Sequence, residues 1–244
     1  MRYAITLALG AVLLAGSVLA GPELTIPHTS FDFGYMPQHA VATHKYELRS
    51  TGDAELIITQ IKPGCGCTKT PLEKNTLAPG EATELELVFD SKRFRGPVTK
   101  AARIFSNEGR EHQLIDFTAN ILIRPDSTWP VIVTPYKMNM SQLGSSPRTE
   151  AEFTLTNLSE NDLSPALITA ADDYISVTLP EVIAAGQSAT GRVQLTDAAV
   201  KMEFEKSFTF ELDDGGRTRF TVPVTRTLFG SDKQAAGQAS AGTQ

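Results

Sequence analysis

A pattern about a hundred residues long occurs twice in this sequence. The segment that starts at Tyr46 (Tyr-Glu-Leu-Arg-Ser-Thr-Gly-Asp) matches the segment that starts at Phe153 (Phe-Thr-Leu-Thr-Asn-Leu-Ser-Glu), 107 positions later. Two further matches follow in the same order, from Leu77 to Ile183 and from Asn107 to Asp213, each at an offset of 106. Because the repeats of solenoid proteins are only about 20–50 residues long, this spacing indicates a duplicated domain. We therefore predict two modules of related fold.

Both copies show the alternation of apolar and polar residues that is typical of half-buried β-strands. Residues 84–90, 115–121 and 208–212 alternate in this way, as expected where successive side chains face opposite sides of a sheet. Turn signals rich in Gly, Pro, Asn and Asp separate such runs at 50–53, 79–80, 107–109 and 213–216. Many short strands with turns at these intervals predict an all-β protein built as sandwiches or barrels.

The first twenty residues have the three parts of a secretory signal peptide. Arg2 supplies a positive charge, residues 5–14 are apolar, and small residues precede a cleavage site between Ala20 and Gly21. A retained membrane anchor is the weaker alternative, because the apolar run is short for a bilayer span. No later segment is long and apolar enough to span a membrane. We therefore expect a periplasmic or secreted protein without an integral membrane segment in its mature chain.

The domain boundaries follow from the repeat and from a polar stretch that contains two prolines. We predict a signal peptide at 1–20, a first domain at 21–124, a linker at 125–130, a second domain at 131–229 and a disordered tail at 230–244. The linker is short, so the modules should lie end to end with restricted freedom. Trp129, the single tryptophan, is expected to pack between the modules.

Composition argues against several classes of function. The chain has 22 basic and 28 acidic residues and a net charge of −6, and we identify no cluster of Lys and Arg, so nucleic-acid binding is not expected. No catalytic motif is present, and the acidic pairs at 172–173 and 213–214 lie in predicted turns. We therefore predict that the protein is not an enzyme. His44 lies on an apolar strand face, where a hydrogen-bonded core histidine is more common than a ligand.

The sharpest local motif is Cys65-Gly66-Cys67-Thr68, which contains the only two cysteines of the chain. Three interpretations remain open. Both cysteines could be small buried side chains, which free thiols in an oxidising compartment make less attractive. They could form a small disulfide ring for thiol–disulfide exchange, with Gly66 accommodating the strain. They could also bind a metal, for which Cu(I) suits two soft ligands better than zinc does.

The first module resembles a known family. The resemblance rests on residues 31–34 (Phe-Asp-Phe-Gly), 41–52, 56–61, the Cys-Gly-Cys-Thr run, 79–81 and 87–90, within about residues 24–122. This order is similar to bacterial domain-of-unknown-function family 1573, which is related to the abnormal-spindle/hydin-type Ig-like domains. The resemblance implies a seven-stranded Ig-like β-sandwich, typically exported and with no established enzymatic activity. It also implies that Cys65, Gly66, Cys67 and Thr68 are the family's signature; the second module, which lacks them, looks like a diverged copy.

These observations lead to two functional hypotheses. The first is an exported, non-enzymatic protein of the cell envelope, in which two tandem Ig-like sandwiches serve as a structural or protein-interaction module for an envelope partner. The alternative is a periplasmic thiol-redox or copper-binding protein that uses Cys65 and Cys67. No cofactor other than copper is suggested by the sequence.

Overall fold

The computed structural model describes residues 21–124, 126–143 and 148–229. The predicted signal peptide and the predicted tail therefore lie outside the described residues. Within those ranges the chain is built of strands and turns, with one short 3-10 helix, η1 (Ala198–Lys201). No helix among the described residues has the length and apolar character needed to cross a bilayer. The prediction of an all-β protein with two Ig-like sandwiches in tandem is confirmed.

The first sandwich consists of two layers of antiparallel and mixed strands. One layer has the order β1-β3-β7-β5 and the other the order β2-β9-β8-β4-β6. Six of its strands are long and three have two residues each, where the family resemblance implied seven strands. Their bounds are β1 (Leu24–Thr25), β2 (Ser30–Pro37), β3 (Val41–Ser50), β4 (Leu56–Pro63), β5 (Thr68–Lys69), β6 (Thr76–Leu77), β7 (Ala82–Asp90), β8 (Gly96–Ser106) and β9 (Gln113–Leu122).

The second sandwich repeats this arrangement. One layer has the order β10-β13-β16-β15, and the other contains β14-β17-β18 with β11 parallel to β18. A further pair, β12 with β19, extends from it. The bounds are β10 (Val131–Thr134), β11 (Met138–Asn139), β12 (Gln142–Leu143), β13 (Glu150–Asn157), β14 (Pro165–Thr169), β15 (Ile175–Thr178), β16 (Ser188–Leu195), β17 (Phe204–Leu212), β18 (Arg219–Arg226) and β19 (Leu228–Phe229).

The strand pairs correspond between the two halves as the sequence repeat predicts. The β8–β9 hairpin corresponds to β17–β18, and the β3–β7 pair corresponds to β13–β16, at the offsets read from the sequence. By the same spacing β14 is the counterpart of β4. The alternation of residues explains the register, because the apolar side chains of each pair then share the inner face of a sandwich.

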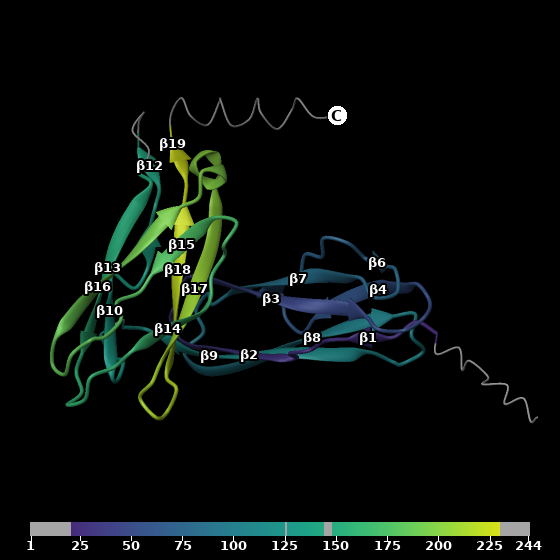
Figure 1. Cartoon of the computed structure of the whole chain (residues 1–244), viewed down its shortest axis with the longest axis horizontal. Helices are drawn as coiled ribbons and strands as arrows, with labels where there is room; N and C mark the ends of the chain where they lie inside the picture. Colours follow the sequence, from purple (N-terminus) through teal and green to yellow (C-terminus); the bar gives the residue numbers. More distant parts are fainter. Residues whose placement is uncertain (1–20, 125, 144–147, 230–244) are drawn as a thin grey trace, which may run out of the picture.

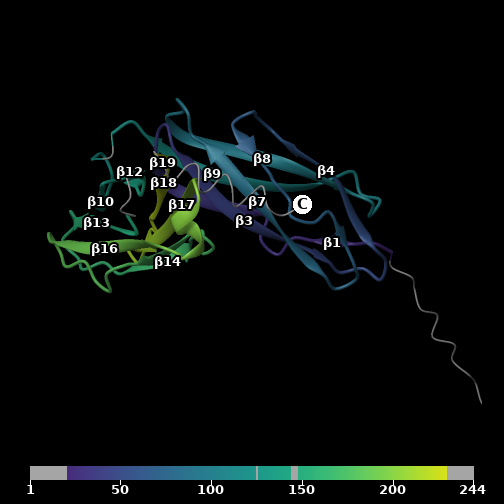
Figure 2. The same cartoon turned by 90° about the horizontal axis from the view of Figure 1, so that it is seen from above.

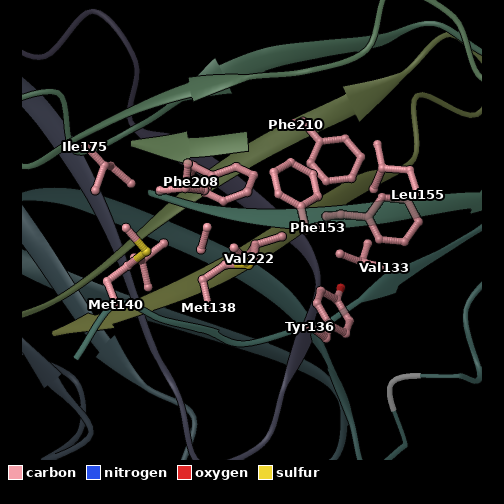
Figure 3. Close-up of a cluster of buried hydrophobic side chains, with 14 of the residues drawn as sticks. Val133, Tyr136, Met138, Met140, Phe153, Leu155, Ile175, Phe208, Phe210 and Val222 are labelled. Atoms are coloured by element: carbon pink, nitrogen blue, oxygen red, sulfur yellow. The ribbon is translucent and has the colours of Figure 1, made fainter. Parts of the chain in front are cut away.

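Buried hydrophobic side chains form two separate clusters. One cluster contains residues between Leu24 and Ile121, and the other contains residues between Leu122 and Val224. In the second cluster Phe153, Phe208 and Phe210 pack with aliphatic and methionine side chains between the two layers (Figure 3). Each sandwich therefore has a core of its own, while the exact domain and linker bounds stay a prediction.

The two sandwiches are joined by more than the linker. Strand β18 lies parallel to β2, with Phe220 opposite Tyr35, so one sheet continues from the first sandwich into the second. The strands of the two modules cross at a steep angle (Figure 1), and the view from above shows β17 and β18 next to β3 (Figure 2). The expectation for Trp129 was wrong: its side chain is 61% exposed, because β2, β3, β17 and β18 form the junction.

Candidate functional site

Cys65 and Cys67 are joined by a disulfide in the turn between β4 and β5. Their Cα atoms are 5.2 Å apart. The two sulfurs differ in environment, since Cys67 is only 6% exposed whereas Cys65 is partly exposed at the edge of the first core. Of the three alternatives for the two cysteines, the structure contains the small disulfide ring. The proposed redox role of the pair stays a prediction.

Backbone hydrogen bonds hold this turn against its neighbours. The N–H of Gly64 donates to the carbonyl of Ala101 at 2.8 Å, and the N–H of Asp90 donates to the carbonyl of Cys67 at 2.9 Å. The hydroxyl of Thr68, which is 5% exposed, lies 3.5 Å from the sulfur of Cys65. A Cβ at position 66 would meet no atom within 4 Å, so the space around Gly66 does not by itself require a glycine.

One lysine side chain contacts the cysteine turn. The ammonium group of Lys92 lies 3.5 Å from the carbonyl oxygen of Gly66, and among the described residues it forms no ion pair. Lys62 and Lys69 are close to the turn in sequence, on β4 and β5, but the ammonium group of Lys62 lies over the ring of Phe105, 5.0 Å from its centre. The carboxylate of Asp90 accepts the backbone N–H of Lys92. Lys92 therefore supplies the positive charge that is in contact with the turn.

A metal site is not assembled in this state. Among the described residues no group of three or more His, Cys, Asp and Glu side chains is placed to hold a metal ion. The sulfurs of Cys65 and Cys67 are bonded to each other, and only thiolates are good ligands for a soft metal. Copper binding would therefore require the reduced pair, and the copper hypothesis stays a prediction.

A second feature, which the sequence interpretation did not locate, is the free edge of strand β14. This strand ends the large sheet and pairs with β17 only. Leu167 and Ile168 are 41% and 39% exposed, next to an irregularity in the register between Leu167 and Thr169. The strand, Pro-Ala-Leu-Ile-Thr, carries no charge. The edge therefore lacks the charged side chains that commonly protect native edge strands, although Pro165 and the irregularity in register interrupt it.

The edge of β14 borders an open cleft between the two modules. The cleft is lined by side chains of both sandwiches, among them His28, Phe31, His44, Ile168 and Arg219. Strand β14 itself lies close to the junction of the two sandwiches (Figure 1). The alternation of residues 42–48 indicated that His44 lies on the apolar face of its strand. It could not predict that Ile168 and Arg219, which are distant in sequence, line the same cleft.

His44 occupies an unusual position in this cleft. Its ring stacks on Phe31 with centroids 3.7 Å apart, and it meets the ring of Tyr46 edge-on. Its buried Nδ1 atom has no hydrogen-bond partner among the described residues, so the expectation of a hydrogen-bonded core histidine is wrong for this atom. Burial, together with the charges of Arg219 and His28, lowers the pKa of His44 from 6.5 to about 4. The imidazole is therefore neutral at neutral pH.

The fold and the cysteine turn define the chain as an Ig-like β-sandwich protein. Residues 24–121 match the model of the family described as "Protein of unknown function (DUF1573)", which confirms the resemblance for the first module. No curated protein matches this chain in sequence. No enzymatic family is indicated for it.

Several solved structures share part of the fold at low sequence identity. A protein of unknown function from Porphyromonas gingivalis W83 is 14% identical with a TM-score of 0.37, and the match covers 84% of this chain and 99% of that one. The ASH/PapD-like domain 7 of human CEP192 is 9% identical with a TM-score of 0.36, covering 49% of this chain and 99% of that domain. The VesB protease of Vibrio cholerae is 10% identical with a TM-score of 0.34, covering 41% and 31%.

Proposed function

We propose that this chain is an exported, non-enzymatic protein of the cell envelope that binds an extended segment of a partner protein along strand β14. The observation that carries the proposal is the exposed, uncharged edge of this strand. Export is supported by the signal-peptide pattern of residues 1–20. The function thus needs no catalytic residues, in keeping with the lack of a catalytic motif in the sequence.

The physical basis is β-augmentation. The outer backbone N–H and C=O groups of an edge strand can form hydrogen bonds with a strand of a partner, which gives affinity. The exposed side chains of the edge strand then determine which partner sequences bind. Leu167 and Ile168 offer apolar surface at this edge. The other edges of the second sandwich, β10 and β15, contain no large hydrophobic residue of comparable exposure. We therefore expect a partner segment with apolar side chains.

The cleft next to β14 gives the partner a second contact. Ile168 and Thr169 line it together with Phe31 of the first sandwich. A strand added to β14 would therefore pass the junction and contact both modules. The continuous sheet fixes the two modules against each other, so this composite surface would be presented without a large reorganisation on binding, which reduces the entropic cost of association.

Recovery of partners from an envelope extract tests this proposal. We expect Leu167→Lys and Ile168→Lys to reduce recovery at least about tenfold, because a charge at the edge opposes pairing with an apolar strand. Val182→Lys is a matched control, since Val182 is 50% exposed in the same module but lies outside the strands. The double variant Cys65→Ser/Cys67→Ser should keep the partner. Undiminished recovery by both β14 variants, or loss of the partner in a folded double cysteine variant, would contradict the proposal.

A further inference from the structure

A second activity, independent of β14, is suggested by the unequal exposure of the two disulfide sulfurs. We propose that the Cys65–Cys67 disulfide accepts electrons from a pair of thiols on a partner protein with an acidic surface, and that Cys65 is the sulfur attacked. Cys65 is partly exposed, whereas Cys67 is 6% exposed and its neighbouring backbone is hydrogen-bonded to β7. An incoming thiolate can therefore approach Cys65 with little rearrangement, while an approach to Cys67 requires the turn to open.

Cys67 is the leaving group when Cys65 is attacked. Attack on Cys65 breaks the S–S bond and leaves Cys67 as a thiolate. The hydroxyl of Thr68 lies 3.5 Å from the sulfur of Cys65 and 3.8 Å from the sulfur of Cys67, so it can donate to either sulfur once the pair is reduced. The ammonium group of Lys92 lies at the carbonyl of Gly66, between the two cysteines. The difference in exposure, rather than these contacts, therefore selects Cys65 for attack.

The complete exchange takes two successive thiolate attacks. A first partner thiolate bonds to Cys65 and expels the Cys67 thiolate, which gives a mixed disulfide. The second partner thiolate then attacks the partner sulfur of that mixed disulfide and expels the Cys65 thiolate. The partner gains a disulfide and loses two protons and two electrons, and the Cys65 and Cys67 thiolates take up two protons to form the reduced pair.

The charge around the turn selects the partner. The ammonium group of Lys92 lies at the turn of the disulfide and forms no ion pair among the described residues. Acidic residues close to the partner's thiols would therefore speed the encounter, whereas basic residues would slow it. Such steering depends on ionic strength and disappears at high salt.

The second sandwich argues against a purely structural disulfide. The turn between β14 and β15 corresponds to the cysteine turn and has Ala171 and Asp173 at the positions of the two cysteines. This module nevertheless forms the same strand order. The disulfide closes a ring of only three residues, so it adds little constraint to the unfolded chain. The fold therefore does not depend on it, which favours a chemical role.

Exchange with reduced glutathione, followed by rapid alkylation and peptide mapping, tests which sulfur is attacked. The full chain, purified without reductant, should lack two protons relative to its reduced mass. We expect glutathione on Cys65 and the alkyl group on Cys67. Glutathione found mainly on Cys67, or a folded protein whose disulfide does not exchange, would overturn the proposal. These results do not depend on β14, so they are separate from the test of the proposed partner surface.

Two dithiol peptides test the partner class. One carries Glu and the other Lys on both sides of a Cys-Gly-Gly-Cys core. We expect the acidic peptide to be oxidised up to about tenfold faster at low salt, and Lys92→Glu to remove most of this preference. Lys201→Glu is the control, because Lys201 is exposed in the second module, away from the cysteine turn. Equal rates for the two peptides at low salt would overturn the preference for an acidic partner.

Discussion

Gly34 and Arg219 approach each other so closely at the junction that no side chain fits between them. A Cβ on Gly34 would lie 2.1 Å from the carbonyl oxygen of Arg219. Gly34 also has a φ of +60°, which favours glycine. Next to this contact the hydroxyl of Thr221 donates to the carbonyl of Phe33 at 2.6 Å. The position of one sandwich against the other therefore depends on a glycine in β2.

Replacing Gly34 by alanine should disturb this junction. We expect Gly34→Ala to lower the free energy of unfolding by about 1–2 kcal/mol for the backbone conformation and by about 1–3 kcal/mol more for the clash. Gly109→Ala is the matched control, because Gly109 has a φ of +83° but nothing within 4 Å of its Cβ. Denaturant unfolding of both variants gives the comparison. An equal decrease in the free energy of unfolding of the two variants would show that the close approach to Arg219 does not affect stability.

Two ion pairs between the modules should differ in their contribution to stability. Lys206 pairs with Glu86, with side chains only 13% and 23% exposed, and its ammonium group lies 4.7 Å from the ring centre of Tyr174. Lys45 pairs with Asp173, with side chains 42% and 72% exposed, and at the same time with Glu84 of its own module.

We expect Lys206→Met to cost about 1–3 kcal/mol, because it leaves the carboxylate of Glu86 largely buried without its partner. For Lys45→Met we expect a loss of less than about 1 kcal/mol, as is usual for exposed pairs. Thermal unfolding measures both. A larger loss for Lys45→Met would mean that burial does not set the strength of these contacts.

The sequence predicts much of the fold because alternation and repetition are local properties of the chain. The offset between Tyr46 and Phe153 correctly pairs β3 with β13, and the match from Asn107 to Asp213 correctly pairs the two hairpins. The same pattern cannot predict that β18 adds to β2. That contact joins backbone groups, and its one sequence signal is a glycine, Gly34, within an alternating strand.

The candidate sites are less predictable for a related reason. The Cys-x-Cys spacing is compatible with a disulfide, with metal binding and with simple burial, and only the positions of the surrounding residues favour one of them. Lys92 lies far from the cysteines in sequence, so its contact with Gly66 depends on the pairing of β5 with β7. The edge of β14 likewise becomes visible only once the strand order of the sheet is known.

The separate cores predict that the first sandwich folds without the second. A fragment of residues 21–126 retains all the buried side chains of the first cluster, so we expect cooperative unfolding in denaturant. It also exposes the side of β2 that pairs with β18, so we expect it to associate at high concentration, as measured by sedimentation. Non-cooperative unfolding of the monomeric fragment would contradict the predicted domain boundary and show that the second sandwich is required.

The neutral state of His44 makes the stability of the protein dependent on pH. Because the folded pKa is about 4 and the unfolded value is 6.5, the unfolded chain binds more protons between these pH values. The contribution of His44 is therefore complete above about pH 6.5 and is lost as the pH falls towards 4. Its upper limit is about 3 kcal/mol, and partial exposure of the ring reduces it.

The variant His44→Phe should remove this dependence. It keeps an aromatic ring on Phe31 and has no titrating group, so the difference in unfolding free energy between this variant and the parent should grow as the pH falls from 6.5 to 4. His28→Gln should weaken the dependence, because His28 lowers the pKa of His44. His39→Asn, at an exposed position outside the cleft, serves as the control. A difference between His44→Phe and the parent that stays constant across this range would show that His44 does not titrate as its burial predicts.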